Sequence, residues 1–513
     1  MANIFRGKTP RTRQAIKCQS WLWIMLCLLG CQTEPLPTPT AVSLITPSII
    51  TAVPTHTPMR ILPTVVLATA TPPPSYTPLL VPPTASATST AVPPTQTATA
   101  TATATPKLYA TIDVTTYPPG TAVPTPIPPF PKGDNIINII LLGNDVATSQ
   151  GGRTDSLILV SINRESKSVT MLSLPRDIFV VIPGWQMTRI NLALPHGHGS
   201  DYPGGGGALI KDTIEYNLGI PVDYYARIGF NGFKEAVDAV GGIEMVVNCP
   251  LTDWRLISPD LDPEVEENWE RFTLASGIHQ MDGDLALWFA RSRRSTNDFE
   301  RGLRQQRVLQ AIFQQSLQAD ILSELPDLWQ AYQHNIETDM SLSLLVELAS
   351  LAPTIAENGI RHLTLPLASL RSWRDPANGA SVQLLDWETA APVLSQLMQP
   401  PALNRATGPG LVVAVVTDDM VLYRQTADNL AWFGFMPQHE AMHVTSEHTQ
   451  ITYYGPNRKG SYDWLLSWLF HRETADIALA PDEDSDVDYR VWLGHDTNPC
   501  LPYLQSPQAP GKP

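Results

Sequence analysis

The chain has 513 residues, too many for one ordinary domain, and a formal net charge of -15 with only 16% charged residues. The acidic balance argues against a nucleic-acid-binding surface. The 48 prolines exclude a globular fold for the whole chain, and the five cysteines form no C-x-x-C pair and no spacing that suits zinc.

The N-terminus has the order of a lipoprotein signal peptide. A basic leader precedes the apolar run Trp21–Gly30, which is too short to span a bilayer and fits a signal-peptide core. The run ends Leu-Leu-Gly-Cys, so residues 1–31 are predicted to be a signal peptide with a lipobox that ends at Cys31. A plain signal peptide or a short membrane anchor is the alternative. Lipidation of Cys31 would hold the protein on the outer face of the bacterial cytoplasmic membrane.

The next segment, residues 32–131, is predicted to be a disordered tether. Between Gln32 and Phe130 there are 25 Thr and 22 Pro but only four charged residues, with no helical or strand period to bury. Such a segment stays extended, and at about 3.1 Å per residue its limiting reach is on the order of 300 Å. It would lift a folded head off the membrane surface.

The folded part begins near Lys132 with three predicted strands, Asn135–Leu142, Leu157–Ile162 and Val169–Leu174. Each strand begins or ends beside a charged residue: Asp145 after the first, Arg153 and Asp155 before the second, Arg176 after the third. If these strand ends meet at one edge of a sheet, they gather the charges into a site.

Several elements separate these strands from the next charged segment. The four-glycine loop Gly204–Gly207 lacks the G-K-[ST] of a phosphate loop, so we predict a flexible lid there. His196 and His198 precede it and have no third metal-ligand partner. The other expected elements are the helices Ala208–Asn217 and Phe230–Val240, the strand Ile243–Val247, and an acidic surface insertion at Asp253–Glu270.

The segment Ala290–Arg307 holds six arginines, which repel one another unless water or an anion lies among them. Arg301, Arg304 and Gln305 share a helix face with Val308 and Ile312, which have the character of core positions. A basic face that continues an apolar face points into a pocket. The segment therefore predicts an anion site, with a solvated basic surface as the alternative.

Beyond this segment, Asp320–Met398 is predicted to be mostly helical and completes a head over residues 132–400. A second, smaller α/β domain is predicted over residues 405–498, followed by a loose tail over 499–513. Its expected elements are strands at Leu411–Val416, Thr449–Tyr454 and Tyr489–Leu493, and helices at Thr426–Phe433 and Tyr462–Phe470. A disulfide between Cys249 and Cys500 is possible in an exported protein, but sequence supplies no geometry for it.

Seven motifs in order resemble the LytR-CpsA-Psr family of bacterial cell-envelope proteins. They are IILLGND (Ile139–Asp145), GRTDSLILVSIN (Gly152–Asn163), SLPRD (Ser173–Asp177), RIN (Arg189–Asn191), DAVGG (Asp238–Gly242), GIHQMDGDLALWFARSR (Gly277–Arg293) and DFERGLRQQ (Asp298–Gln306). Leu411–Asp496 is similar to the accessory domain often attached to this family, with Thr417-Asp418-Asp419 in place of the usual Asn-Gly-rich turn.

The resemblance implies a three-layer α/β/α sandwich that transfers a glycopolymer, as a sugar phosphate, from a polyprenyl pyrophosphate carrier to peptidoglycan. Asp145 and Asp155 would hold Mg²⁺, and Arg189 stands where the family commonly has Lys. Asn297 and Glu300 replace glycines that the family often has, and the family's usual anchor is a transmembrane helix. The residues expected to grip the pyrophosphate by resemblance are Arg153, Arg176, Arg291, Arg293, Arg301 and Gln305, to which the helix-face argument adds Arg304, and Arg189 completes the set.

Planar guanidinium groups suit this chemistry because they make bidentate contacts with phosphate oxygens. We take Arg153, Arg176, Asp298 and Arg301 as catalytic candidates; Asp298 is either a general base or an ion-pair partner of the arginines. Expected partners are the lipid-linked glycan, peptidoglycan, and the membrane through the lipid anchor, with no nucleic acid. A pyrophosphohydrolase and a non-catalytic lipid-binding module are the alternatives. A serine acyltransferase is disfavoured because the chain has no G-x-S-x-G and no S-x-x-K.

Overall fold

The computed structural model describes residues 107–111, 124–144, 152–258, 260–293, 298–319, 325–399, 410–458 and 461–501. The predicted signal peptide with Cys31, most of the predicted tether, Asp145, and the tail beyond residue 501 lie outside these ranges. Within the described ranges, no helix is both long enough and apolar enough to cross a membrane.

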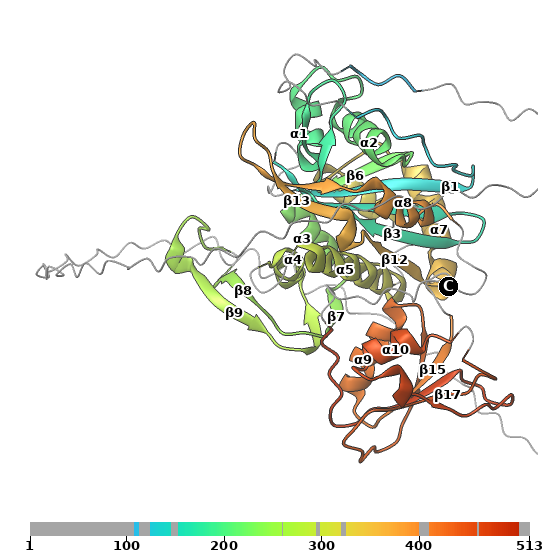
Figure 1. Cartoon of the computed structure of the whole chain (residues 1–513). Coiled ribbons are helices and arrows are strands. Elements are labelled where there is room, and N and C mark those ends of the chain that lie inside the picture. Colours follow the sequence, from blue (N-terminus) through green and yellow to red (C-terminus); the bar gives the residue numbers. More distant parts are fainter. Residues whose placement is uncertain are drawn as a thin grey trace, which may run out of the picture. The chain divides into compact units, whose positions relative to one another are not determined.

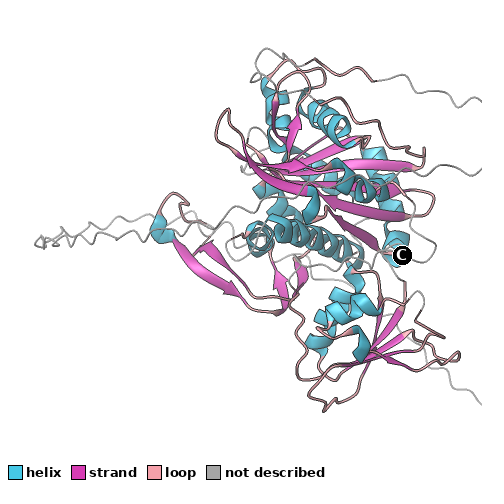
Figure 2. Ribbon diagram, viewed as in Figure 1, coloured by secondary structure: helices cyan, strands magenta, loops and turns pink. Residues whose placement is uncertain are grey.

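A six-stranded sheet forms the centre of the N-terminal module, residues 124–399 (Figures 1 and 2). Its order is β11-β6-β1-β2-β3-β12, with β1, β2 and β3 antiparallel to one another and with β6 and β12 parallel to β1 and β3. The three predicted strands are confirmed. The strands are β1 (Ile136–Asn144), β2 (Thr154–Asn163), β3 (Ser168–Ser173), β6 (Tyr224–Ile228), β11 (Ile336–Thr338) and β12 (Ile360–Thr364).

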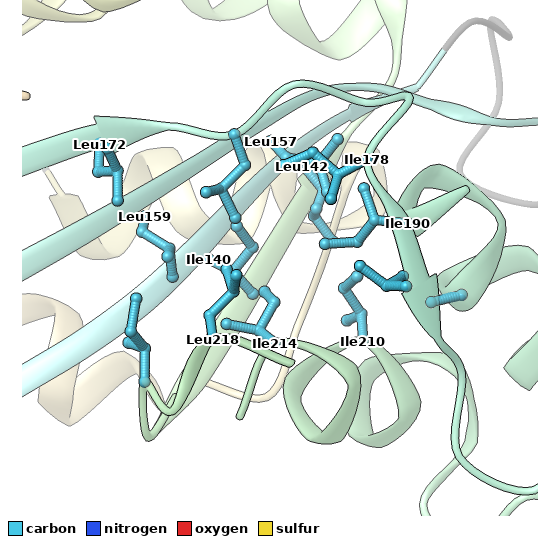
Figure 3. Packing of buried hydrophobic residues seen from close by; sticks show 14 of the residues in the cluster. Ile140, Leu142, Leu157, Leu159, Leu172, Ile178, Ile190, Ile210, Ile214 and Leu218 are labelled. Atoms are coloured by element: carbon cyan, nitrogen blue, oxygen red, sulfur yellow. The ribbon is translucent and has the colours of Figure 1, made fainter. Parts of the chain in front are cut away.

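The near-continuous apolar run of β1 is explained by burial on both faces of the sheet. Ile140 and Leu142 face one side, where they pack with Leu157, Leu159 and Leu172 against helix α2 (Figure 3). That layer contains α1 (Ala193–Gly199), α2 (Gly205–Leu218) and α8 (Trp387–Gln396).

The residues of β1 that alternate with these, Ile137 and Ile139, face the opposite layer. There they pack with Leu309 and Phe313 of α5 (Asp298–Gln318) and with Leu348 of α7 (Leu342–Asn358). Helices therefore cover both faces of the sheet, and the predicted α/β/α sandwich is confirmed.

The four-glycine loop is a close-packed helix start rather than a lid. Gly197 of α1 meets Gly206 so closely that a Cβ on Gly197 would lie 2.6 Å from the Gly206 Cα, and a Cβ on Gly207 would enter the ring of Tyr225 on β6. The φ values of Gly204 and Gly205 are +83° and +68°, which favour glycine. The prediction of a flexible lid was wrong, because the glycines serve packing between α1, α2 and the sheet.

We expect Gly207→Ala to destabilise the fold by about 1–3 kcal/mol, since the added methyl group must displace the Tyr225 ring in a packed layer. Urea unfolding measures the change. Gly199→Ala is the matched control, because a Cβ at that exposed helical residue meets nothing within 4 Å. Equal stability of the two variants would contradict the packing explanation.

The acidic insertion is a hairpin whose base joins the fold. Strands β8 (Leu251–Leu256) and β9 (Trp269–Leu274) pair antiparallel, and Trp288 of α4 (Gly283–Arg291) donates its indole N–H to the Trp254 carbonyl at 2.9 Å. Nearby lie α3 (Phe230–Ala239) and the pair β7 (Ile243–Val247) and β10 (Gly277–Met281). The prediction of a mere surface insertion was therefore incomplete.

The segment after α5 differs from the mostly helical prediction, because it supplies β11 and β12 to the two edges of the central sheet. Its helices are α6 (Leu325–Tyr332), α7 and α8. Two small antiparallel pairs complete the module: β4 (Phe179–Val181) with β5 (Met187–Arg189), and β13 (Leu370–Arg374) with β14 (Ser381–Leu385).

Residues 410–501, the C-terminal module, form the predicted small α/β fold, with a five-stranded sheet in the order β16-β15-β19-β17-β18. Its apolar core includes Val413, Leu466 and Val491. The elements are β15 (Val412–Val416), α9 (Met420–Trp432), β16 (Met436–Glu440), β17 (Gln450–Tyr453), α10 (Asp463–Leu469), β18 (Ala478–Leu479) and β19 (Tyr489–Trp492).

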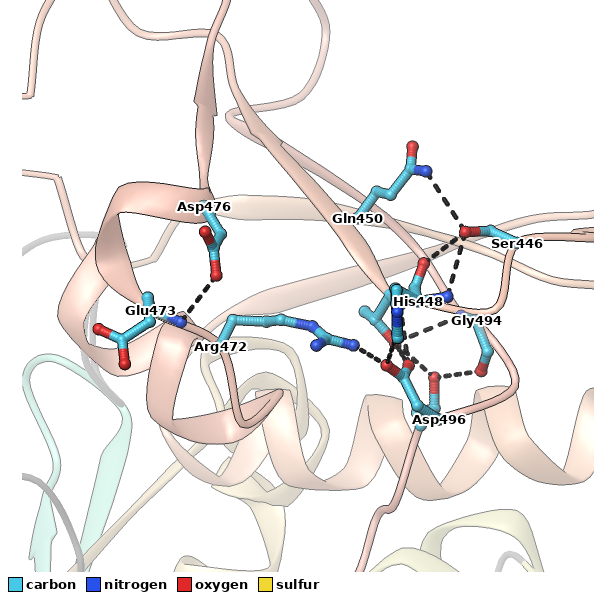
Figure 4. A network of polar contacts seen from close by, with 10 residues as sticks. Ser446, His448, Gln450, Arg472, Glu473, Asp476, Gly494 and Asp496 are labelled. Atoms are coloured by element: carbon cyan, nitrogen blue, oxygen red, sulfur yellow. Dashed lines mark hydrogen bonds and ion pairs between the residues drawn. The ribbon is translucent and has the colours of Figure 1, made fainter.

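A polar network closes one end of this sheet (Figure 4). The carboxylate of Asp496 accepts hydrogen bonds from the Thr449 backbone N–H at 2.9 Å and from His448 Nδ1 at 2.8 Å, and it pairs with Arg472. Partial burial acts to raise the pKa of Asp496, but these donors outweigh it and hold the pKa well below its usual range. The network fixes the chain after β19.

The two modules are joined by a disulfide between Cys249 and Cys500 and by ring stacking at β12. His362 of β12 stacks on Trp432 of α9 with ring centroids 3.8 Å apart, and its Nδ1 lies 2.9 Å from Gln306 Oε1 of α5. Because Gln306 uses its amide nitrogen to donate to Ser173, its oxygen accepts from a neutral His362. Burial lowers the pKa of His362 to about 3.

A histidine held neutral in this way makes stability depend on pH. The unfolded chain takes up a proton near pH 6.5 and the folded chain only near pH 3, so stability is fully present above pH 6.5 and falls between these values. We expect this residue to contribute a slope of up to about 1.4 kcal/mol per pH unit. Urea unfolding from pH 4.5 to 7 should show a smaller slope for His362→Asn than for the unsubstituted chain. Identical slopes for the two proteins would show that His362 is not the source of this pH dependence.

Candidate functional site

Charged residues from two strand ends, the end of β3 and the start of β2, meet at one end of the central sheet. The start of β2 lies at the same end of the sheet as the last residues of β1 and β3, because these neighbouring strands are antiparallel. Arg176, after β3, donates from Nη1 to Asp155 Oδ1 of β2 at 2.5 Å. The expectation that strand ends gather these charges is confirmed for Arg176 and Asp155; Asp145 lies outside the described residues.

Asp177 holds two of the predicted phosphate-binding arginines together. Its carboxylate lies 3.6 Å from Arg176 Nε and 3.3 Å from Arg189 Nε, and Arg189 is the last residue of β5. All three side chains are roughly a quarter exposed, so the pairs are partly screened from solvent. Asp177 is therefore an ion-pair partner of both arginines.

The arginines of α4 and α5 approach the same place. Asp282 caps the start of α4 by accepting a hydrogen bond from the Leu285 backbone N–H at 2.9 Å. The helix ends at Arg291. Asp298, at the start of α5, lies 3.2 Å from Arg301 Nη1 and 3.8 Å from Arg293 Nη1. Asp298 thus acts as the ion-pair partner that was one of its two predicted roles; its role as a base stays a prediction.

We call Arg176, Arg291, Arg293 and Arg301 the arginine cluster. Arg301 is buried, and its Nη2 donates to the Asp155 carbonyl at 3.4 Å, which links α5 to β2. Burial lowers the pKa of Arg301, and the positive charges of Arg176 and Arg293 lower it further while Asp298 opposes them. Repulsion among partly buried guanidinium groups favours an anion between them.

The pKa of Arg176 shifts in the opposite direction from that of Arg301. Burial lowers its pKa, but the hydrogen bond to Asp155 and the charges of Asp155, Asp177 and Asp298 more than offset that effect and raise the pKa. The same carboxylates therefore touch both halves of the arginine cluster. This brings residues more than a hundred positions apart in sequence into one electrostatic unit.

Gln305 and Arg304 behave differently from each other, although both were predicted to bind the pyrophosphate. The Gln305 side chain lines the cavity, accepts from Ser156 Oγ at 2.9 Å and donates to the Ala290 carbonyl at 3.3 Å. Arg304 instead donates to the Phe289 carbonyl at 3.1 Å and to the Ser292 carbonyl. Arg304 therefore satisfies carbonyls at the C-terminus of α4 and is not among the residues that line the cavity, and its role as a phosphate ligand stays a prediction.

A cavity of about 880 Å³ adjoins the arginine cluster. Its polar end includes Asp155, Arg291, Arg293, Arg301 and Gln305. Its remaining lining is mainly apolar and comes from β1, β2, α3, α4, α5 and the hairpin, with Leu141, Ile158, Phe233, Leu285, Trp288, Val308 and Leu309 among the residues. Helices α3 and α5 thus both contribute to the apolar lining, through Phe230, Phe233, Val308 and Leu309.

The hairpin supplies a wall of the cavity that sequence reasoning missed. Trp254, Ile257 and Trp269 line it, and Asp253 Oδ2 accepts from the Arg293 backbone N–H at 2.7 Å. Trp254 and Trp269, near the two ends of the otherwise acidic segment Asp253–Glu270, were the signal available. The Phe230 ring at the start of α3 lies 3.9 Å from the Arg291 guanidinium and supports it.

Two predicted ligands lie at the margin of the site. Arg153 is exposed and immediately precedes β2, two residues before Asp155. Arg189 reaches the site through Asp177. Neither residue, nor Arg176, lines the cavity itself.

The donor chemistry at Asp155 fits Mg²⁺, which prefers carboxylate oxygens and phosphate oxygens. Asp155 lines the cavity, and its hydrogen bond from Arg176 fixes the orientation of the carboxylate. Across the described ranges no three His, Cys, Asp or Glu side chains gather as a metal site. A site there would therefore depend on substrate oxygens and on Asp145, which lies outside those ranges.

Comparison with known proteins finds similar sequences. The chain is 30% identical over 225 residues to the polyisoprenyl-teichoic acid–peptidoglycan teichoic acid transferase TagU of Bacillus cereus, covering 43% of this chain and 66% of that protein. It is 30% identical over 219 residues to TagT of Bacillus subtilis, a transferase of the same description, covering 42% of this chain and 63% of that protein. The chain thus spans less than two thirds of either relative.

Solved structures give partial matches. The crystal structure of B. subtilis TagV has 25% sequence identity and a TM-score of 0.42, covering 52% of this chain and 96% of that one. B. subtilis TagT, solved with bound octaprenyl pyrophosphate lipid, has 25% identity and a TM-score of 0.37, covering 53% and 92%. The LytR_cpsA_psr family matches residues 94–398, more than half of the chain, and the protein belongs to that family.

Proposed function

We propose that this protein transfers a glycopolymer, as a sugar phosphate, from a polyprenyl pyrophosphate carrier to peptidoglycan. One observation carries the proposal: an apolar cavity of about 880 Å³ ends at a partly buried arginine cluster. A molecule that fits both parts has a long apolar chain and a multiply charged anionic head. The relatives TagU and TagT, named as teichoic acid transferases, support that substrate class.

In the proposed reaction, a hydroxyl oxygen of the acceptor attacks the phosphorus on the sugar side of the diphosphate. A P–O bond forms to the acceptor, the bond to the bridging oxygen breaks, and the lipid leaves as a monophosphate. The hydroxyl proton passes to a base or to water. Little covalent chemistry falls to the protein, so positioning and charge stabilisation supply most of the rate.

The arginine cluster would perform that stabilisation. Arg301 and Arg176 come from α5 and from the end of β3, so they approach a diphosphate from two sides. Their fixed carboxylate partners keep the guanidinium planes in place before substrate binds, which avoids reorganisation during the reaction. Asp298, which lies between Arg293 and Arg301, is the candidate for accepting the proton.

We further propose that Asp155 and Asp145 hold Mg²⁺ together with diphosphate oxygens. A bound Mg²⁺ would neutralise charge on the diphosphate. Two other parts of the proposal rest on sequence alone: Cys31 carries a lipid anchor, and the Thr- and Pro-rich segment lets the head reach the cell wall from the outer face of the cytoplasmic membrane.

Turnover of a synthetic polyprenyl pyrophosphate sugar, with peptidoglycan fragments and Mg²⁺ present, tests the proposal. The expected result is release of polyprenyl monophosphate together with a sugar phosphate bound to the acceptor. Free sugar phosphate without acceptor modification would assign a pyrophosphohydrolase instead. Tight binding without turnover would assign a lipid-binding module, and neither binding nor turnover would exclude the substrate class.

A further inference from the structure

Arg307 belongs to the arginine-rich segment but takes no part in the site. It lies six residues after Arg301 on α5, about 120° around the helix at 3.6 residues per turn. Its side chain is 8% exposed, pairs with Asp428 of α9, and places its guanidinium 4.8 Å from the ring of Trp432. Arg307 thus joins the helix that carries Arg301 to the C-terminal module.

The C-terminal module also contacts the base of the β8–β9 hairpin, which forms another wall of the cavity. The connection from β7 to β8 contains Cys249, which forms the disulfide to Cys500. Directly before it in the chain, the Val247 carbonyl accepts from Gln425 Nε2 at 2.8 Å, and Asn248 Nδ2 donates to Asn429 Oδ1 at 2.8 Å. These contacts fasten the base of the hairpin whose Trp254 lines the cavity.

Two neighbouring residues of α9 bridge these contacts. Asp428 pairs with Arg307 and also accepts from Asn248 at 3.1 Å, and Asn429 accepts from Arg307 at 3.4 Å while donating to the Pro499 carbonyl at 2.8 Å. One turn of α9 therefore contacts α5, the hairpin base and the segment that ends in the disulfide. A further ion pair, Arg424 with Glu244, links α9 to β7.

We infer that the C-terminal module is a clamp that sets the spacing between α5 and the hairpin, and that Asp428 is a positioning residue for Arg301. The expected effect of Asp428 on the reaction rate rests on the proposed function. Its expected effect on the position of α5 does not. The described contacts link the module to α5, to the hairpin base and, through the stacking of Trp432 on His362, to β12. Loss of the module should therefore leave the arginine cluster present but misplaced. A misplacement of about 1 Å is enough to lower a rate about 10²-fold.

The test compares full-length Asp428→Asn with Asp418→Asn. Asp418 forms an exposed ion pair with His443 in the same module and contacts neither α5 nor the hairpin in the described structure. Two readouts are taken: hydrogen exchange of α5 amides against β1 amides, and kcat with KM for polyprenyl pyrophosphate sugar. Asp428→Glu, which keeps the charge, should recover most of the rate.

For Asp428→Asn we expect faster exchange in α5 with β1 unchanged, and a kcat about 10²-fold lower with a smaller change in KM. Asp418→Asn should match the unsubstituted protein in both. Unchanged α5 exchange, or equal acceleration in α5 and β1, would overturn the inference. If the unsubstituted protein shows no turnover, the proposed function fails, whereas the exchange result still decides the clamp.

Reduction of the folded, unsubstituted protein with dithiothreitol gives the same comparison without a substitution, should Asp428→Asn fail to fold. Opening the Cys249–Cys500 bond removes the covalent part of the clamp. We expect amides at the base of β8 to exchange faster, with β1 again unchanged. No change at β8 would show that the module does not hold the hairpin and would overturn that half of the inference.

Discussion

Arg301→Lys is expected to lower kcat about 10²–10³-fold, the loss typical of removing one preorganised donor of charge stabilisation. Arg301 is buried at the polar end of the cavity and is held by Asp298 at 3.2 Å and by the Asp155 carbonyl. Lysine keeps the positive charge but not the planar fork that contacts two phosphate oxygens at once. The measurement is release of polyprenyl monophosphate at saturating substrate.

Arg271→Lys is the matched control, since Arg271 is exposed on β9 and does not line the cavity. It should turn over like the unsubstituted protein. Because Arg301 also links α5 to β2, circular dichroism must show that the Arg301→Lys variant is folded. A folded variant with undiminished kcat would mean that Arg301 does not contact the reacting diphosphate.

The second large effect is expected for Asp155→Asn, with kcat lowered about 10²-fold or more and a higher Mg²⁺ concentration needed for half-maximal rate. Asp155 carries two functions in this account. Its Oδ1 accepts a hydrogen bond from Arg176 at 2.5 Å and so orients that guanidinium. Its carboxylate is also proposed to bind Mg²⁺. Asparagine keeps the shape but loses the charge that both functions need.

Measuring the reaction rate over a range of Mg²⁺ concentrations tests the predicted change in kcat and in Mg²⁺ requirement. Electron paramagnetic resonance of Mn²⁺ binding in the presence of polyprenyl pyrophosphate tests metal binding independently of activity. Asp339→Asn is the control, because Asp339 pairs with Lys211 and does not line the cavity. If Asp155→Asn lowers the rate but leaves metal binding and Mg²⁺ dependence unchanged, Asp155 only orients Arg176 and the metal proposal is wrong.

Part of the site could be predicted from the sequence, namely the residues whose positions follow from apolar strand runs or from helical spacing. The apolar runs of β1, β2 and β3 predict buried strands, and antiparallel neighbours must bring the charges at their ends to one edge. This logic placed Asp155 and Arg176 together. The same helix-face spacing placed Arg301 and Gln305 at the cavity.

For Arg304, the helical period shows which residues share its face but not what lies opposite. The end of α4 lies there, and its unsatisfied carbonyls bind the guanidinium. The hairpin was misjudged for a similar reason: acidic residues dominate its sequence, whereas Trp254 and Trp269 line the cavity. Tertiary contacts override both patterns.

Short or polar strands were also beyond sequence reasoning. β11 has three residues, and β12 reads Ile-Arg-His-Leu-Thr, so neither shows an apolar run or a clean alternation. Both are strands because the edges of the central sheet offer unpaired backbone groups. The pairing of Cys249 with Cys500, separated by 251 positions, likewise depends on how α9 packs against β7.

A crystal structure of the protein with polyprenyl pyrophosphate tests the proposed substrate site most directly. The diphosphate is expected among Arg176, Arg291, Arg293 and Arg301, with the isoprenoid chain running between β1, α5 and the hairpin. A lipid bound elsewhere, or a diphosphate at that place with its chain outside the cavity, would contradict it.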